Sequence, residues 1–197
     1  MTLAGQGVEA DPAAAALLLE MSGSLGSARA MARLGHLSRL GAKNFPKDFP
    51  QAMVWYERSL KIAVLDETLN GMGQLYRQGL GVPADPVKAR GLFEQAIAKG
   101  SVDAMVHLAG MLDGGVGGPS DRPKALTLVR EALIRSNQLH PDNRKLAEAW
   151  AARGDKGMAF QEPSGGTRVA SGPKLDAAPK IKDEEINAIL RLSLIHI

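Results

Sequence analysis

The sequence predicts an all-α fold, a right-handed α-solenoid of helix-turn-helix repeats, about three and a half units long and followed by a disordered tail. Two observations support this prediction: a glycine-rich turn recurs at a fixed interval, and apolar stripes of helical period flank it. The turn aspartates are Asp11, Asp48, Asp85 and Asp121, so successive turns are 37, 37 and 36 residues apart. Such a period is typical of helix-turn-helix arrays, in which each unit buries its apolar face against its neighbours.

The clearest unit includes residues 71–100, which read as a helix, a glycine-rich turn and a second helix. Glycines let the chain reverse, because they adopt positive φ without strain. Asp85 then precedes Pro86, which is the pattern of an N-cap followed by the first helical residue. The second helix has one apolar stripe at helical spacing, made of Ala89, Leu92, Phe93, Ala96 and Ile97.

The neighbouring units repeat this pattern, and we interpret their stripes as core positions. The second helices repeat it at Ala52, Trp55, Tyr56, Ser59 and Leu60, and at Ala125, Leu128, Val129, Ala132 and Leu133. Each first helix has a stripe of its own and, beside it, a small residue that lets two helices approach closely: Gly35, Gly73 or Ala109. Asp48 and Asp121 are the expected N-caps of the second helices in these units.

These residues resemble the Sel-one-like repeat family, which is related to the tetratricopeptide repeats. The best match is Thr68, Met72, Gly73, Tyr76, Gly79, Gly81, Val82, Asp85, Lys88 and Ala89, and the next unit keeps Ala104, Leu108, Gly115, Gly117, Asp121, Lys124 and Ala125. The unit before them matches less well, since Ser38 replaces the aromatic residue and residues 44–46 replace the Gly-Val turn. The resemblance implies a scaffold that binds other proteins.

We therefore expect one solenoid domain over residues 1–155. Its units are about 1–26 (a partial unit), 27–63, 64–100 and 101–136, and a capping helix follows at 141–153, where a degenerate fourth unit is the alternative. Residues 156–180 read as a disordered linker because they are rich in glycine, proline and serine, and residues 181–191 read as a short helix. Residues 192–197 resemble a translated sequencing adaptor, and the chain opens inside a repeat, so we expect a fragment of a longer bacterial protein.

The chemistry that the sequence offers is that of a binding protein, and we expect no enzyme, no metal and no cofactor. There is no cysteine, so disulfides and thiolate metal sites are excluded. The four histidines lack zinc-site spacing, and His36 and His107 are expected to face solvent. The turn at 113–118 lacks the motif of a phosphate-binding loop. The net charge of +3 is spread along the chain, which does not favour nucleic acid.

The resemblance also implies where a partner would bind, since the first helix of each unit lines the concave groove of such solenoids. Carried over residue by residue, the groove positions are Arg29, Ala32, His36 and Arg39, then Glu67, Asn70, Gln74 and Arg77, and last Asp103, Val106, Gly110 and Asp113. The arginines at one end favour an acidic or carboxylate-bearing peptide. We expect a monomer that binds a protein or peptide partner, in signalling or envelope regulation, and no inserted membrane segment.

Two questions stay open at this point. The repeats could instead be the targeting arm of a larger enzyme or membrane-associated protein whose other domain lies beyond residue 191. The compartment could be the bacterial cytoplasm or the periplasm, because the first residues show no signal peptide and the lack of cysteine fits both.

Overall fold

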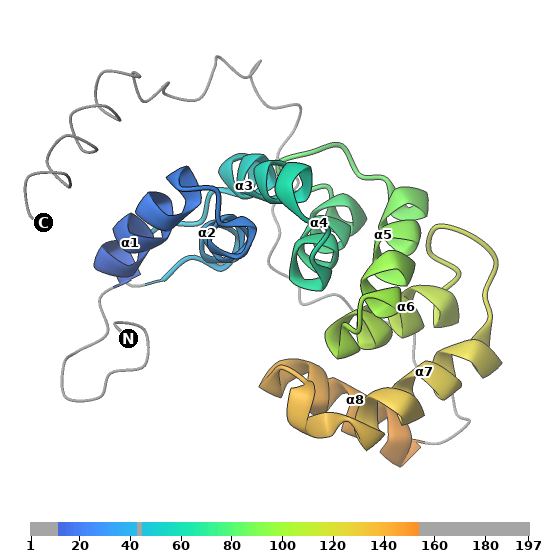
Figure 1. Cartoon of the computed structure of the whole chain (residues 1–197). Helices are drawn as coiled ribbons and strands as arrows, with labels where there is room; N and C mark the ends of the chain where they lie inside the picture. Colours follow the sequence, from blue (N-terminus) through green and yellow to red (C-terminus); the bar gives the residue numbers. More distant parts are fainter. Residues whose placement is uncertain (1–11, 43–44, 154–197) are drawn as a thin grey trace, which may run out of the picture.

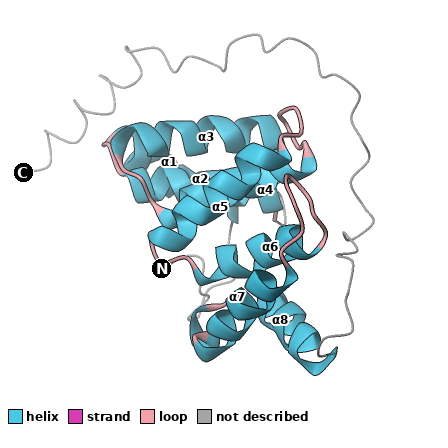
Figure 2. Cartoon of the chain, turned by 90° about the vertical axis from the view of Figure 1, so that its right-hand side faces the viewer, coloured by secondary structure: helices cyan, strands magenta, loops and turns pink. Residues whose placement is uncertain are grey.

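In a computed structural model of the chain, the structure describes residues 12–42 and 45–153. These residues form α1 (Pro12–Ser24), α2 (Ala28–Leu40), α3 (Phe49–Ile62), α4 (Asp66–Gln78), α5 (Pro86–Ala98), α6 (Val102–Asp113), α7 (Arg122–Ile134), a short 3-10 helix (Ser136–Gln138) and α8 (Pro141–Arg153). Figure 2 shows only helices and loops in this part of the chain, which confirms the all-α prediction. The predicted linker, terminal helix and adaptor-like end, and the turn that contains Asp11, lie outside the described residues.

The helices pair as hairpins, α2 with α3, α4 with α5 and α6 with α7, and these pairs make the most extensive contacts. The first helices of neighbouring hairpins also touch, α2 with α4 and α4 with α6. The second helices α3, α5 and α7 do not contact one another to the same extent. The layer whose helices approach each other is the inner layer of a curved stack, and Figure 1 shows this arc running from α1 to α8. The chain is thus an α-solenoid.

Each hairpin is closed by the same pair of hydrogen bonds at its turn aspartate. The Oδ1 atoms of Asp48, Asp85 and Asp121 accept the backbone N–H three residues later at 2.9, 2.9 and 3.0 Å. The backbone N–H of each aspartate donates to a carbonyl near the end of the first helix, at Ser38, Tyr76 and Leu112, over 2.8 to 2.9 Å. These bonds satisfy groups that helix ends otherwise leave open, and they confirm the three predicted N-caps.

Two glycines in the turns are required by the neighbouring hairpin as well as by the local backbone. Gly81 has φ +70°, and a Cβ there would lie 2.5 Å from the backbone nitrogen of Pro50. Gly117 has φ +77°, and a Cβ there would overlap the carbonyl oxygen of Pro86. Each of these turns therefore abuts the start of the preceding second helix, where only glycine fits.

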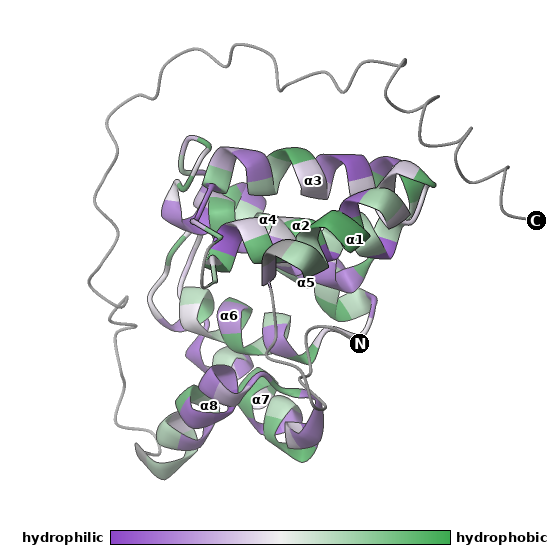
Figure 3. Ribbon diagram, turned by 90° about the vertical axis from the view of Figure 1, so that its left-hand side faces the viewer, coloured by the Kyte–Doolittle hydropathy of each residue, from purple (hydrophilic) through white to green (hydrophobic). Residues whose placement is uncertain are grey.

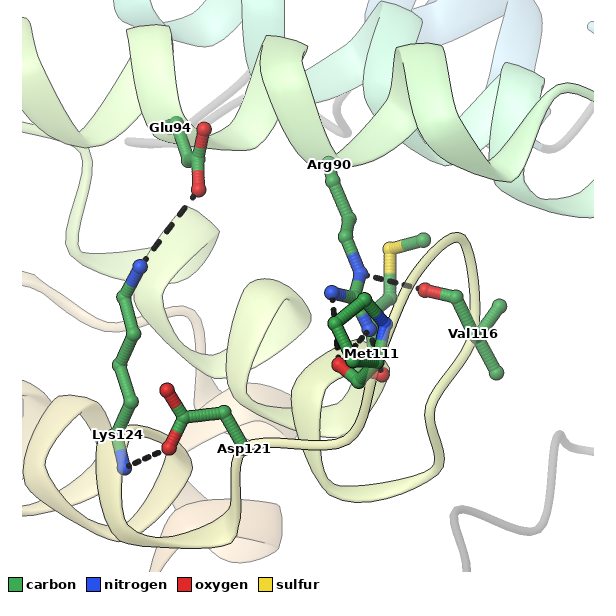
Figure 4. A network of polar contacts seen from close by, with 7 residues as sticks. Arg90, Glu94, Met111, Val116, Asp121 and Lys124 are labelled. Atoms are coloured by element: carbon green, nitrogen blue, oxygen red, sulfur yellow. Dashed lines mark hydrogen bonds and ion pairs between the residues drawn. The ribbon is translucent and has the colours of Figure 1, made fainter.

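Arg90 of α5 ties its hairpin to the next one (Figure 4). Its Nε donates to the carbonyl of Val116 at 2.6 Å. Its two terminal nitrogens donate over 2.9 to 3.2 Å to the carbonyls of Met111, Gly118 and Pro119. On the same side, Nζ of Lys124 lies 3.7 Å from Oε1 of Glu94. The guanidinium thus holds the turn between α6 and α7 against α5.

The predicted stripes of the second helices form the core. Their shared first position, Ala52, Ala89 or Ala125, is fully buried in each hairpin, and so is Phe93. Ser59 is an exception in chemistry, because its buried Oγ donates to the carbonyl of Ala28 at 2.9 Å and lies 2.9 Å from Oγ1 of Thr68. This polar contact joins α2, α3 and α4 where a stripe pattern alone predicts apolar packing.

The surface at the N-terminal end of the stack is hydrophobic. Three large apolar side chains of α1 are exposed, Leu17, Leu18 and Met21, and so is Leu25, which follows the helix. Figure 3 colours parts of the α1 ribbon green, the colour of hydrophobic residues. Within the described residues, no helix combines the length and the apolar character that crossing a membrane requires.

Candidate functional site

The concave surface consists of the inward side chains of α2, α4 and α6. Most of the predicted groove residues of α2 and α4 have partial or full exposure: Arg29, His36 and Glu67 are exposed, and Arg39, Asn70, Gln74 and Arg77 are half-buried. Ala32 is buried, at 2% exposure. On α6, Asp103 is half-buried and Val106 is buried. The accessible part of the predicted site therefore belongs mainly to the first two hairpins.

At one end of this surface, Arg29 faces Glu67 across the α2–α4 contact, with 4.0 Å between Nε and Oε1. Partial burial raises the pKa of Glu67, while the positive charges of Arg29 and Arg33 oppose that rise. Because both side chains of the pair are largely exposed, the contact adds little stability. It does compensate the charge of Arg29, which makes Arg29 a weaker anion ligand than the sequence indicates.

Arg39 lies further along the surface and has no such compensation. Its Nη2 is 3.4 Å from Nδ1 of His36, and no carboxylate of the described residues is within ion-pair distance of it. The His36 side chain as a whole is exposed, but loss of water around its ring, together with the charges of Arg39 and His140, lowers its pKa to about 4, and Asp103 acts in the opposite direction. At neutral pH the histidine is thus uncharged, and Arg39 is a half-buried positive charge.

His107 corrects a prediction, because it does not face solvent. It is 8% exposed, and its ring lies 5.4 Å from the ring of Phe93. Burial lowers its pKa to about 3, and the charges of Arg77 and Arg39 add to the effect. Arg39 of α2 and Arg77 of α4 thus form a positively charged region near His107 of α6, which is itself buried and uncharged at neutral pH.

Two predicted residues of α6 have structural tasks instead. Oδ1 of Asp103 accepts hydrogen bonds from the backbone N–H of His140 at 3.0 Å and from Nδ2 of Asn143 at 2.7 Å, so it holds the start of α8. Val106 is 3% exposed and packs in the core. Val106 is thus closed to a ligand, and Oδ1 of Asp103 is already engaged with α8.

Sequence reasoning assigned Tyr56 to the core, and the structure shows that its hydroxyl also belongs to this region. Tyr56 is 1% exposed. Burial raises the pKa of its hydroxyl, and the nearby Arg39 guanidinium opposes that rise. The sequence does contain a sign of this position: Gly35 and Gly71, on the first helices, flank the Tyr56 ring.

These groups are suited to binding an anion rather than to making or breaking bonds. Guanidinium, phenol and amide groups donate hydrogen bonds, and a carboxylate accepts them. Within residues 12–42 and 45–153, no cluster of three or more histidine, aspartate or glutamate side chains could hold a metal ion.

The family model and one solved structure agree with the fold. The Sel1 repeat model matches residues 1–27, 28–61, 67–101 and 102–133. No curated protein matches the chain. A solved Sel1 repeat protein from Oxalobacter formigenes is 23% identical, with a TM-score of 0.59 over 74% of this chain and 58% of that one. A protective antigen of uropathogenic Escherichia coli with an SLR fold is 19% identical, with a TM-score of 0.37 over 88% of this chain and 48% of the other.

The chain spans about half the length of these two solved proteins, 58% and 48%. Sel1 repeats generally mediate contacts between proteins, and their fold is a non-catalytic scaffold. The four matched repeats cover more than half of the chain and include the three helical hairpins described above. The chain belongs to the Sel1 repeat family.

Proposed function

We propose that this protein is a non-catalytic scaffold that binds an acidic segment of a partner protein on its concave surface. The observation that supports this most strongly is Arg39, a half-buried guanidinium with no carboxylate of the described residues within ion-pair distance. Partial burial strips water from a charge, and the cost is recovered only when an anion pairs with it. A carboxylate of the partner would supply that anion through charge-assisted hydrogen bonds.

The surroundings of Arg39 favour the same kind of ligand. Arg77 adds a second guanidinium close to His107, and both His36 and His107 are neutral at neutral pH, since their pKa values are lowered to about 4 and about 3. The charge of this region therefore comes from arginine and stays constant over the physiological pH range. The ligand position lies toward α2 and α4, because the groove residues of α6 are less available: Asp103 is engaged with α8 and Val106 is buried.

The test is charge reversal on the concave surface. The double variant Arg39→Glu with Arg77→Glu should lose at least about tenfold in affinity for a fluorescein-labelled octapeptide of alternating alanine and glutamate. The control is Arg58→Glu with Lys61→Glu, which makes the same charge change at two exposed positions of α3. Circular dichroism should show equal helicity in both variants, and equal affinities of the two variants would refute the assignment of the binding surface.

A further inference from the structure

The ring of Tyr56 extends from α3 between the first helices α2 and α4 toward the concave surface. At Gly35 of α2 a Cβ would lie 2.6 Å from Cε1 of this ring, and at Gly71 of α4 a Cβ would overlap Cζ and the hydroxyl oxygen. Neither position admits a side chain while the tyrosine keeps its place. The two glycines thus open a passage between α2 and α4, and the hydroxyl ends near Arg39 and Glu67.

The other hairpins do not repeat this feature. Phe93 occupies the equivalent place on α5 and packs on Gly73, where a Cβ would lie 2.7 Å from its Cε1. The counterpart of Gly71 is His107, whose ring stacks on Phe93 and closes the passage. The third hairpin has Val129 at this place. Among the described hairpins, a hydroxyl therefore reaches the concave layer at the crossing of α2 and α4 alone.

Two hydrogen-bond donors at this crossing lack an acceptor. The hydroxyl of Tyr56 and Nε of Arg39 are both buried, and Nε takes part in no hydrogen bond within the described residues. The Arg39 guanidinium interacts with the phenol oxygen, but it offers no acceptor for the phenol proton. Buried polar groups nearly always have partners, so two unsatisfied donors in one place need an explanation. An oxygen acceptor with two lone-pair directions would satisfy both of them.

We infer that Tyr56 and Arg39 together bind one carboxylate of the partner's acidic segment at the crossing of α2 and α4, and that Tyr56 determines the preference for an acid over its amide. This inference rests on the proposed function and adds the position of the acid along the stack. Neither donor reaches solvent in the free protein, so the half-buried Arg39 side chain turns outward when the acid enters. The phenol O–H then donates to one carboxylate oxygen and the guanidinium to the other.

The experiment compares two tyrosine variants, since the chain has only two tyrosines. Tyr56→Phe removes the hydroxyl at the crossing. Tyr76→Phe is the matched control, because the Tyr76 hydroxyl accepts a hydrogen bond from Nζ of Lys88 at 2.7 Å and lies on an exposed contact. Affinities are measured for the alanine–glutamate octapeptide and for its alanine–glutamine counterpart. The Nε–H resonance of Arg39 reports directly on the site.

Tyr56→Phe should weaken binding of the glutamate peptide by about tenfold and leave binding of the glutamine peptide unchanged. Its thermal midpoint should rise by about 2–4 °C, because an unpaired buried hydroxyl has been removed. Tyr76→Phe should keep the affinity of the wild type for both peptides. In the wild type, the glutamate peptide should shift the Arg39 Nε–H resonance.

Two outcomes would overturn the inference, and they are distinguishable. If the wild type binds the glutamate peptide, Arg39→Glu with Arg77→Glu abolishes binding and Tyr56→Phe does not change the preference for glutamate over glutamine, the tyrosine has no part in recognition. The proposed function would then stand. If the wild type does not bind the glutamate peptide, the proposed function fails and this inference fails with it.

Discussion

Replacing Gly73 with alanine tests whether the small residues of the first helices are required by the aromatic rings of the second helices. A Cβ at Gly73 would lie 2.7, 2.9 and 3.0 Å from three atoms of the Phe93 ring. Carbon atoms in contact are normally about 3.5–4.0 Å apart, so the ring or the helix must move by up to about 1 Å. Phe93 is fully buried and its ring also contacts the ring of His107, which leaves it little room to yield.

The expected magnitude follows from two opposing effects. Overpacking in a close-packed core costs about 1–3 kcal/mol, and a glycine-to-alanine change inside a helix returns about 1 kcal/mol through helix propensity. Gly73→Ala should therefore lower the free energy of unfolding by about 1 kcal/mol. Gly73→Leu places a larger side chain at the same site and should cost about 1–3 kcal/mol.

Gly91 provides the control, since it lies inside α5 and a Cβ there would have no heavy atom within 4 Å. Gly91→Ala should raise the free energy of unfolding by about 0.5–1 kcal/mol, because only the helix propensity changes. Urea denaturation of both variants at one pH measures the difference. If Gly73→Ala proved as stable as Gly91→Ala, close packing of the ring against α4 would not be the reason for the glycine.

Two further predictions concern the hairpin junction and the buried histidine. Arg90→Ala should lower the free energy of unfolding by about 1–2 kcal/mol in urea denaturation, because the carbonyls of Met111, Val116, Gly118 and Pro119 lose a charged donor. Lys124→Ala, which breaks an exposed ion pair, should change it by much less than about 1 kcal/mol, and equal effects would contradict the assignment. The pKa of His107 is about 3 in the folded protein and about 6.5 when unfolded. The unfolded state thus binds more protons between these values, and stability falls as the pH drops below 6.5, by about 2 kcal/mol at pH 5. Denaturation of His107→Gln at pH 7 and pH 5 should show this part of the pH dependence removed, and an unchanged dependence would show that His107 is not its source.

The candidate site could be predicted in part. The resemblance to tetratricopeptide-like repeats predicts Arg39 and Arg77 as groove residues, because equivalent positions of a repeat share a helix face. It could not show that Asp103 holds α8, since that contact depends on the irregular segment between Ile134 and Pro141. Nor could it separate Arg29, which pairs with Glu67, from Arg39, which has no carboxylate partner among the described residues. Pairings between hairpins depend on how far the stack curves.

What the sequence alone determined is the local part of this protein: helices, turns, N-caps and the faces that are buried. Asp85 caps its helix through bonds that span three residues, and the stripe of α5 follows from the period of one helix, so both can be derived without knowing the rest of the chain. The tertiary structure decided which side chains meet. Tyr56 has the same place in its stripe as Phe93, yet only its ring passes between Gly35 and Gly71 to the concave surface. The physical reason is that the end point of a buried side chain is set by the close packing of three helices, and no single helix contains that information.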